Sequence, residues 1–270
     1  MKFITKSSLL YRSGVEYADF SINHVLGCAH GCKYPCYAMM MAKRFGKVKD
    51  YGDWLRPRLV SNALELLDHE IPKYRDRINF VHLCFTTDPF MYKHKEVGDL
   101  SLKIIEKLNK NSIKTTVLTK GIYPKELAKK EKYGRNNIYG ITLVSLDEDF
   151  KRRFEPFSAP FKARIKSLKH LHDAGLETWV SIEPYPTPNL VEQDLLEILK
   201  EISFVDKIIF GRLNYNVKTS DFNDGAKFYE SCAKTVVDFC RKENLAYHIK
   251  YGTRSKDNKT TVHVLKEGRL

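Results

Sequence analysis

The segment Gly27 to Ala38 reads G-C-A-H-G-C-K-Y-P-C-Y-A and carries three cysteines at C-x3-C-x3-C spacing: Cys28, Cys32 and Cys36. Three thiolates on one short loop can bind three irons of a [4Fe-4S] cluster, because each iron takes one cysteine, and the fourth iron is then left open. The alternative is a structural zinc ion held by the same sulfurs and by a nitrogen of His30 or His24. Zinc sites usually combine two C-x2-C pairs or a distant pair of histidines, and this sequence shows neither. The spacing therefore favours an iron–sulfur cluster.

The other cysteines do not indicate a disulfide scaffold. The chain has 6 cysteines in 270 residues, and half of them fall on the one loop. In a reducing compartment such clustering points to metal binding rather than to disulfides. Cys232 and Cys240 recur at helical spacing together with Val236. We therefore expect these two cysteines to be small buried hydrophobic residues on the last helix.

Length and composition are those of a globular protein with a sizeable core. Of the 270 residues, 43% are hydrophobic and 29% are charged, which excludes a disordered or collagen-like chain. No apolar run approaches the roughly 18 residues of a membrane span, and the start, M-K-F-I-T-K-S-S, lacks the apolar centre of a signal peptide. These features predict a cytoplasmic protein with no membrane partner. The net charge of +13 favours anionic partners such as nucleic acid.

Short β-branched or aromatic runs alternate with helical patterns along the chain. The runs lie at about 18–25, 79–86, 114–119, 138–145, 177–183, 206–211 and 246–250. Strand–helix–strand repeats of this kind predict parallel pairing through crossovers. Six or seven such units favour an α/β fold of the partial (β/α)6 TIM-type barrel class. We expect a single domain, 1–270, with a core of about 18–212 followed by a C-terminal helix and basic extension at about 213–270.

The cysteine loop resembles the cluster motif of the radical S-adenosylmethionine (SAM) superfamily, C-x3-C-x2-C on the loop after the first barrel strand. It is similar in particular to the branch of spore photoproduct lyase and the DNA repair photolyase-like proteins, whose motif resembles G-C-x-H-G-C-x-Y-C-Y-A. This chain has one more residue, Pro35, before its third cysteine. The resemblance implies a radical SAM core with a [4Fe-4S] cluster on the three cysteines, SAM at the open iron, and either Tyr34 or Tyr37 beside the SAM adenine.

Further stretches resemble the family in the same order, over about residues 20–190. F-T-T-D-P-F (85–90), V-L-T-K-G (117–121) and S-L-D-E-D-F-K-R-R-F-E-P (145–156) resemble the regions that follow the family's second, third and fourth strands. The resemblance implies SAM contacts from Thr87, Asp88, Ser145, Arg164 and Glu183. Three of these, Asp88, Ser145 and Glu183, lie at or just after predicted strand ends, where parallel α/β folds bind ligands.

Cys84 lies near the end of the second predicted strand, four residues before Asp88. Spore photoproduct lyases use a hydrogen-donating cysteine close to this point, so the resemblance implies that the thiol of Cys84 returns hydrogen to a substrate radical. Alternation along the strand is equally consistent with a buried Cys84 that takes no part in the reaction.

The resemblance implies an enzyme in which the reduced cluster cleaves SAM to methionine and a 5′-deoxyadenosyl radical that abstracts hydrogen from a substrate. It also implies a reductant such as flavodoxin or ferredoxin as a partner. The sequence does not identify the substrate, and nucleic acid is one candidate. Two hypotheses from other classes remain: a zinc-stabilised nucleic-acid-binding module, and an activase-like enzyme that modifies a protein partner.

Basic residues interleave with aromatic residues directly after the cysteine loop. The cations are Lys43, Arg44, Lys47, Lys49, Arg56 and Arg58, and the aromatic residues among them are Phe45, Tyr51 and Trp54. Aromatic side chains among cations suit stacked bases beside phosphates. A solvated helix face with aromatic residues in the core gives the same pattern, so both interpretations stay open.

Overall fold

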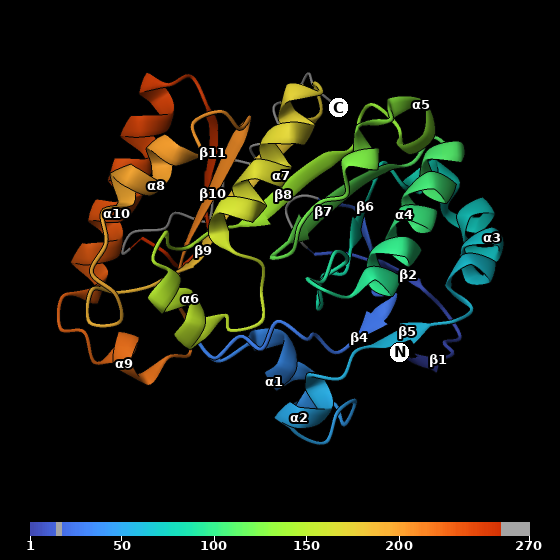
Figure 1. The fold of residues 1–270 in the computed structure, drawn as a ribbon, viewed down its shortest axis with the longest axis horizontal. Helices are drawn as coiled ribbons and strands as arrows, with labels where there is room; N and C mark the ends of the chain where they lie inside the picture. Colours follow the sequence, from blue (N-terminus) through green and yellow to red (C-terminus); the bar gives the residue numbers. More distant parts are fainter. Residues whose placement is uncertain (15–17, 255–270) are drawn as a thin grey trace.

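The computed structural model describes residues 1–14 and 18–254 and is drawn in Figure 1. Its strands are β1 (Lys2–Ile4), β2 (Leu10–Arg12), β3 (Phe20–Ile22), β4 (Val25–Leu26), β5 (Arg58–Val60), β6 (Phe80–Leu83), β7 (Lys114–Thr119), β8 (Ile138–Thr142), β9 (Glu177–Tyr185), β10 (Lys207–Arg212) and β11 (Ala246–Ile249). Its helices are α1 (Tyr37–Arg44), α2 (Tyr51–Trp54), α3 (Ala63–Tyr74), η1 (Arg75–Arg77), α4 (Lys95–Lys110), η2 (Lys125–Ala128), α5 (Lys130–Tyr133), α6 (Glu148–Phe154), α7 (Phe161–Asp173), α8 (Leu195–Glu201), α9 (Val217–Ser220) and α10 (Gly225–Lys242).

The main sheet is parallel over most of its width. Its strand order is β11-β10-β9-β8-β7-β6-β3-β2, with parallel pairing from β3 to β11 and an antiparallel β2 at one edge. Parallel neighbours need crossover connections, and α4, α7, α8 and α10 lie outside the sheet between successive strands in Figure 1. Every residue of β6 and β8 is buried, as expected for strands covered on both faces. The predicted α/β fold with the parallel strands of a partial barrel is confirmed, and among the described strands the sheet is open.

A second, smaller sheet in the order β1-β5-β4 lies beside the first. The sequence predicts one strand at about 18–25, but β3 belongs to the main sheet and β4 to the small one. The chain changes sheets at Asn23 and His24, where the Asn23 Oδ1 accepts a hydrogen bond from the backbone N–H of Thr86 at 3.1 Å. The cysteine loop therefore follows β4 rather than the first strand of the main sheet.

The main sheet extends beyond the expected core of 18–212. Helix α10 returns the chain so that β11 pairs in parallel with β10, from Lys207 opposite Ala246 to Phe210 opposite Ile249. The C-terminal helix is thus part of the same α/β layer arrangement. Of the expected basic extension, residues 255–270 lie outside the described residues.

The core fills the space between the main sheet and its helices. Helix α4 buries Val97, Ile104, Ile105 and Leu108 on one face, as the helical spacing predicts. On α10, Cys232 and Cys240 are buried among apolar residues, which confirms the expectation for these two cysteines. In the part of the chain that the structure describes, no helix has the length and apolar character needed to cross a membrane.

Candidate active site

A cavity of about 170 Å³ lies where the cysteine loop meets the carboxyl ends of β6, β7 and β8. All three loop cysteines line it, together with residues from the three strand ends. The full lining is Cys28, His30, Cys32, Cys36, Ala38, Trp54, His82, Cys84, Phe85, Thr86, Thr87, Asp88, Leu118, Thr119, Lys120 and Thr142. Ligands of parallel α/β folds bind at this end of the strands.

The backbone holds the cysteine loop against α2. Gly27 has φ of +88°, and a Cβ at this position would lie 2.6 Å from the carbonyl oxygen of Trp54. Only glycine tolerates both the conformation and the close approach. The next residue, Cys28, donates its backbone N–H to the same carbonyl at 2.9 Å. The loop ends at Cys36, which directly precedes the first residue of α1.

The three thiols are half-buried and each has a raised pKa. Burial is the main cause in each case, and for Cys28 the neighbouring Asp88, Cys32 and Cys36 add to the shift. Backbone N–H groups face two of the sulfurs, that of His30 toward Cys28 and those of Ala38 and Met39 toward Cys36. Three thiolates would repel one another here unless cations bind between them, and a bound metal deprotonates its thiol ligands outright.

The donor set fits a cluster better than a single ion. Among the residues that the structure describes, no group of three His, Cys, Asp or Glu side chains is placed to hold one metal ion. In a [4Fe-4S] cluster each thiolate binds a different iron, so the three sulfurs need not converge on one point. Three free cysteines along one cavity wall, with N–H donors toward the sulfurs, meet that requirement.

Both histidines proposed as zinc ligands already have polar contacts of their own. His30 Nε2 accepts a hydrogen bond from the backbone N–H of Tyr92 at 3.0 Å, and its Nδ1 lies 3.4 Å from the Asp88 carboxylate. His24 Nε2 lies 2.7 Å from the Ser101 hydroxyl, and its Nδ1 lies 3.5 Å from the sulfur of Cys84. A zinc ion on three cysteines and one of these histidines would have to break such contacts, so the geometry disfavours the zinc hypothesis.

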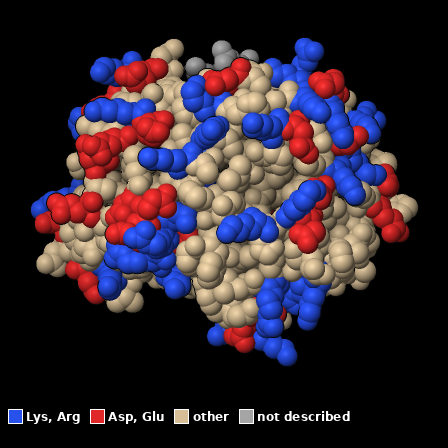
Figure 2. Space-filling view, viewed as in Figure 1, with Lys and Arg blue, Asp and Glu red and all other residues tan. Residues whose placement is uncertain are grey.

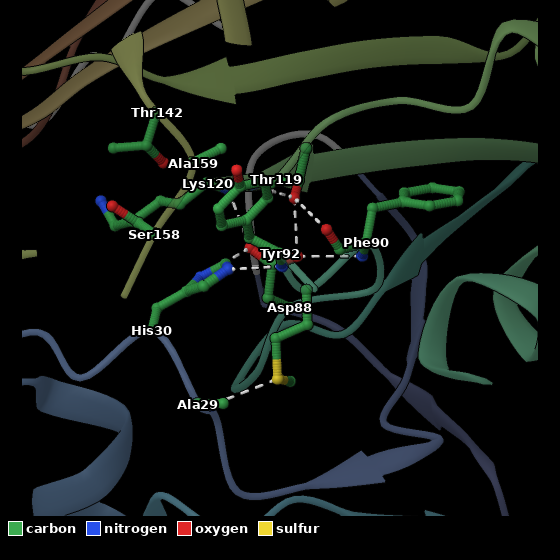
Figure 3. A network of polar contacts seen from close by, with 12 residues as sticks. Ala29, His30, Asp88, Phe90, Tyr92, Thr119, Lys120, Thr142, Ser158 and Ala159 are labelled. Atoms are coloured by element: carbon green, nitrogen blue, oxygen red, sulfur yellow. Dashed lines mark hydrogen bonds and ion pairs between the residues drawn. The ribbon is translucent and has the colours of Figure 1, made fainter. Parts of the chain in front are cut away.

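Asp88 connects the strand ends around the cavity (Figure 3). Its Oδ1 accepts hydrogen bonds from the Thr119 hydroxyl at 2.6 Å and from the backbone N–H of Phe90 at 2.9 Å. Its Oδ2 accepts from the backbone N–H of Lys120 at 2.7 Å and faces His30. The carboxylate is thus used to fix the ends of β6 and β7 and the cysteine loop relative to one another.

A buried ion-pair network around Glu155 contacts the cysteine loop through Tyr34. The carboxylate of Glu155 is fully buried and contacts Arg164 Nη2 at 2.6 Å, Lys120 Nζ at 2.9 Å and the Tyr34 hydroxyl. Burial acts to raise the pKa of Glu155, but Arg164, Lys120 and the Tyr34 hydroxyl together lower it well below the ordinary value. Arg164 also donates to the carbonyls of Thr142 and Ala159, both at 2.9 Å.

The structure brings only some of the predicted SAM contacts to the cavity. Thr87 and Asp88 line it, beside Cys84 and the loop cysteines. Tyr34 and Arg164 are buried in the Glu155 network, and Ser145 is buried with its hydroxyl accepting the backbone N–H of Asp147 at 3.0 Å. Glu183 lies 3.7 Å from Lys250 Nζ near the end of β9.

The two candidate adenine neighbours differ in exposure. Tyr34 is 4% exposed and stacks on Phe150 and Phe154. Tyr37 is 52% exposed and stacks on Tyr215. Of the two, Tyr37 has a ring face that a nucleoside can reach.

Several cavity residues were not singled out from the sequence. They are His82 on β6, Thr119 and Lys120 at the end of β7, and Thr142 at the end of β8. Each lies in the last residues of a parallel strand or just after one, and Thr119 and Lys120 belong to the V-L-T-K-G stretch. His82 is 2% exposed, with Nδ1 2.8 Å from the Thr116 hydroxyl. Strand-end position was the signal that could have found them.

The family of this chain follows from its sequence. Residues 22–202, more than half of the chain, match the model of the Radical SAM superfamily. The chain therefore belongs to the radical SAM superfamily of enzymes. The arrangement of three cysteines at the carboxyl ends of parallel strands agrees with this assignment.

Two curated relatives are uncharacterized proteins. The chain is 29% identical over 199 residues to ORF301 of Acidianus two-tailed virus, covering 70% of this chain and 64% of the relative. It is 25% identical over 180 residues to MJ0683 of Methanocaldococcus jannaschii, covering 66% of this chain and 64% of the relative. The match thus spans 64% of the length of each relative.

Solved structures share the fold. Spore photoproduct lyase complexed with dinucleoside spore photoproduct superimposes with a TM-score of 0.68 at 13% identity, over 92% of this chain and 80% of that chain. SuiB of Streptococcus suis bound to S-adenosylmethionine gives a TM-score of 0.54 at 12% identity, over 85% and 46% of the two chains. At these identities the likeness concerns the fold, which is the one predicted.

Proposed function

We propose that the protein is a radical SAM enzyme whose cluster is held by Cys28, Cys32 and Cys36 and whose substrate radical is quenched by Cys84. The observation that supports the proposal is that these four cysteines line one cavity at the strand ends. When bound, a reduced [4Fe-4S] cluster and SAM supply a 5′-deoxyadenosyl radical that abstracts hydrogen from the substrate.

The protein's own groups position these partners. The cysteine thiolates ligate the cluster, and the backbone N–H groups of His30, Ala38 and Met39 stabilise the sulfurs. Thr87, on the loop after β6, is the SAM contact that stands at the cavity wall, and Asp88 acts there by fixing the loops. Tyr37, the more exposed of the two tyrosines, is the one that we propose beside the adenine, and both Tyr37 and Glu183 lie outside the cavity lining.

Cys84 is placed to give a hydrogen atom to a substrate radical. It is 3% exposed, follows β6 directly and lines the cavity. In the proposed step the S–H bond of Cys84 breaks homolytically, and its hydrogen atom forms a C–H bond at the substrate carbon radical. The resulting thiyl radical returns to the thiol by taking one electron from a flavodoxin- or ferredoxin-type reductant and one proton from water.

Cleavage of SAM is the direct test of the proposed function. Anaerobically reconstituted protein, reduced with dithionite and given SAM, is expected to form 5′-deoxyadenosine and methionine in equal amounts, measured by liquid chromatography and mass spectrometry. The Cys32→Ala variant is expected to form neither, because one iron loses its ligand. Wild-type protein that carries the cluster but forms no 5′-deoxyadenosine would exclude the proposal.

For the substrate, an exposed basic surface favours a nucleic acid. We define the α1–α2 basic surface as the exposed cations Lys33, Lys43, Arg44, Lys47, Lys49 and Arg56. Figure 2 shows Lys and Arg side chains gathered at the lower edge of the molecule, where α1 and α2 lie in Figure 1. This surface adjoins the cysteine loop, so a phosphate backbone bound there would pass close to the cavity.

The interpretation that the aromatic residues of this segment stack on bases is wrong for Trp54. Its side chain is 2% exposed and packs with Ala42 and Val48, so it cannot stack on a base. Arg58 is half-buried and lies 3.6 Å from Asp53. Phe45, in contrast, is 64% exposed, so the interleaved pattern combines a core tryptophan with a charged surface that also carries an accessible aromatic ring.

Salt dependence tests the nucleic-acid proposal. Six phosphate contacts are expected to weaken binding by about 10³-fold or more between 50 and 200 mM salt, measured by fluorescence anisotropy with single-stranded DNA, duplex DNA and tRNA. The Lys43→Glu/Arg44→Glu variant is expected to bind weakly at all salt concentrations, whereas Lys234→Glu/Lys242→Glu on α10, with the same change in net charge, serves as the control. Weak binding of all three nucleic acids by wild-type protein at low salt would favour a protein or small-molecule substrate.

A further inference from the structure

Lys6, on the connection between β1 and β2, is a half-buried cation beside the candidate active site. Its backbone is fixed on both sides, since its N–H donates to Asn62 Oδ1 at 3.1 Å and its carbonyl accepts from Asn62 Nδ2 at 2.8 Å. Its Nζ donates to the carbonyl of Asn23 at 2.7 Å, and no carboxylate of the described residues forms an ion pair with it. An ammonium group has three hydrogens to donate, so Lys6 is held in place with donors left for an anion.

The register of the sheet places Lys6 at the same edge as Cys84. Strand β2 begins at Leu10, which pairs with the last residue of β3, and that residue pairs with the last residue of β6. The chain before β2 and the chain after β6 therefore lie at one edge of the sheet, the edge at which the cavity is found. Burial raises the pKa of Cys84 to about 12, and the charge of Lys6 acts against this rise. The two side chains are thus within electrostatic reach of each other.

The amide of Asn23 connects Lys6 to the cavity wall. Asn23 Oδ1 accepts a hydrogen bond from the backbone N–H of Thr86 at 3.1 Å, and Asn23 Nδ2 donates to the hydroxyl of Tyr11 at 2.5 Å. Thr86 lines the cavity, whereas Lys6, Tyr11 and Asn23 lie outside the lining. Lys6 is therefore separated from the cavity wall by a single residue, Asn23.

Phe85 provides an accessible aromatic ring at this wall. It directly follows Cys84, lines the cavity and is 43% exposed, with a T-shaped ring contact to His82 at 6.5 Å between centroids. The backbone N–H of Thr87 donates to the carbonyl of Cys84 at 3.1 Å, so the chain turns tightly at Phe85. Exposed aromatic rings stack on the bases of single strands. A base inside a duplex is covered on both faces, so the ring suits an unpaired base.

The α1–α2 basic surface continues to Lys6. Burial is the main reason that the pKa of Lys6 is lowered, and the charge of Lys47, a member of that surface, lowers it further. Lys47 and Lys6 are therefore neighbours in the electrostatic sense, and an anion between them would stabilise both cations. A phosphate backbone that follows the α1–α2 basic surface would meet Lys6 next and then the ring of Phe85.

We propose that Lys6 and Phe85 hold one unpaired nucleotide of a single-stranded nucleic acid, with a phosphate at the Lys6 ammonium and the base on the Phe85 ring. This role rests on the proposed function, in which Cys84 gives a hydrogen atom to a substrate radical. Because Phe85 directly follows Cys84, a base on this ring brings carbon atoms of the nucleotide to the thiol.

The salt dependence of binding tests the phosphate contact. Anaerobically reconstituted holoprotein is titrated with fluorescent single-stranded oligothymidylate, and the affinity is measured by anisotropy over a salt series. In Lys6→Met the slope of log K against log[salt] is expected to become shallower by about 0.7, the value of one phosphate contact on a single strand. The control is Lys103→Met, an exposed lysine on α4, whose slope is expected to equal that of the wild type. An unchanged slope in Lys6→Met would refute the phosphate contact.

An abasic strand tests the stacking contact. Phe85→Leu is expected to weaken binding of oligothymidylate about 5-fold or more, because a stacked base is lost. With an abasic strand of the same length, wild-type protein and Phe85→Leu are expected to bind equally. Phe3→Leu is the control, since Phe3 is 65% exposed on β1 and is expected to leave both affinities unchanged. Equal weakening of both strands in Phe85→Leu would refute the stacking contact.

Photo-cross-linking of wild-type holoprotein decides the location without any variant. A single strand that carries 5-iodouracil is expected to cross-link to Phe85, identified by mass spectrometry of the peptides. Protein that forms 5′-deoxyadenosine from SAM but gives no cross-link at Phe85 would overturn the inference alone. A cross-link at Phe85 in protein that carries the cluster but does not cleave SAM would overturn the proposed function and leave the nucleotide site standing.

Discussion

Replacement of Cys28, Cys32 or Cys36 by alanine, one at a time, is expected to remove most of the iron from anaerobically reconstituted protein. In the proposed cluster each of these thiolates is the protein ligand of one iron, and the remaining thiol of the cavity lining, that of Cys84, is proposed to act as hydrogen donor instead. Loss even of a residue that merely orients a ligand typically lowers metal affinity about 10–100-fold, so loss of a ligand has at least that effect. The loss is measured as iron and sulfide per chain and by the visible absorption spectrum.

The matched controls are Cys232→Ala and Cys240→Ala. Both thiols are buried on α10 among apolar residues, so their removal is expected to leave the iron content unchanged while lowering stability slightly. Full iron retention in any of the three loop variants, or stoichiometric zinc without iron in the wild-type protein, would refute the cluster assignment.

The parallel sheet could be predicted because its strands are short, buried and separated by helices with an apolar face. The break between β3 and β4 could not be predicted from the sequence. The run from Phe20 to Leu26 has the apolar character of one continuous strand, and the change of sheet depends on contacts with distant segments. The Asn23 side chain binds the backbone of Thr86, and the carbonyl of His24 accepts the backbone N–H of Val60. No pattern within the run reveals these partners.

The sequence could predict those parts of the candidate site whose residues lie close together in the chain. It could not predict contacts between side chains that are far apart in the chain. The three loop cysteines share one short segment, and Cys84 and Asp88 follow one strand end, so sequence spacing alone brings them together. Tyr34 and Arg164 were expected at SAM, yet both point to Glu155. Tyr34 and Glu155 are 121 positions apart in the chain, and a sequence does not show which of several carboxylates an arginine or a tyrosine contacts.

The Glu155→Gln variant is expected to lower the free energy of unfolding by about 3–5 kcal/mol, the usual effect of removing one partner of a buried ion pair. The substitution keeps the size of the side chain but leaves two cations, Arg164 and Lys120, without their carboxylate. Urea unfolding followed by circular dichroism measures the loss. The control is Asp173→Asn, whose partner Lys169 is 53% exposed and whose loss is expected to stay within about 1 kcal/mol.

The difference in unfolding free energy between wild-type protein and Glu155→Gln is expected to depend on pH. The pKa of Glu155 in the folded protein lies well below its ordinary value of 4.5, so the stabilisation is complete above pH 4.5 and is lost as the pH falls below it. The difference between wild-type protein and Glu155→Gln is therefore expected to be constant from neutral pH to about pH 5. Below pH 4.5 it is expected to shrink by about 1.4 kcal/mol per pH unit. A difference that stays constant down to pH 3, or an effect no larger than that of Asp173→Asn at neutral pH, would show that Glu155 does not hold this network as an anion.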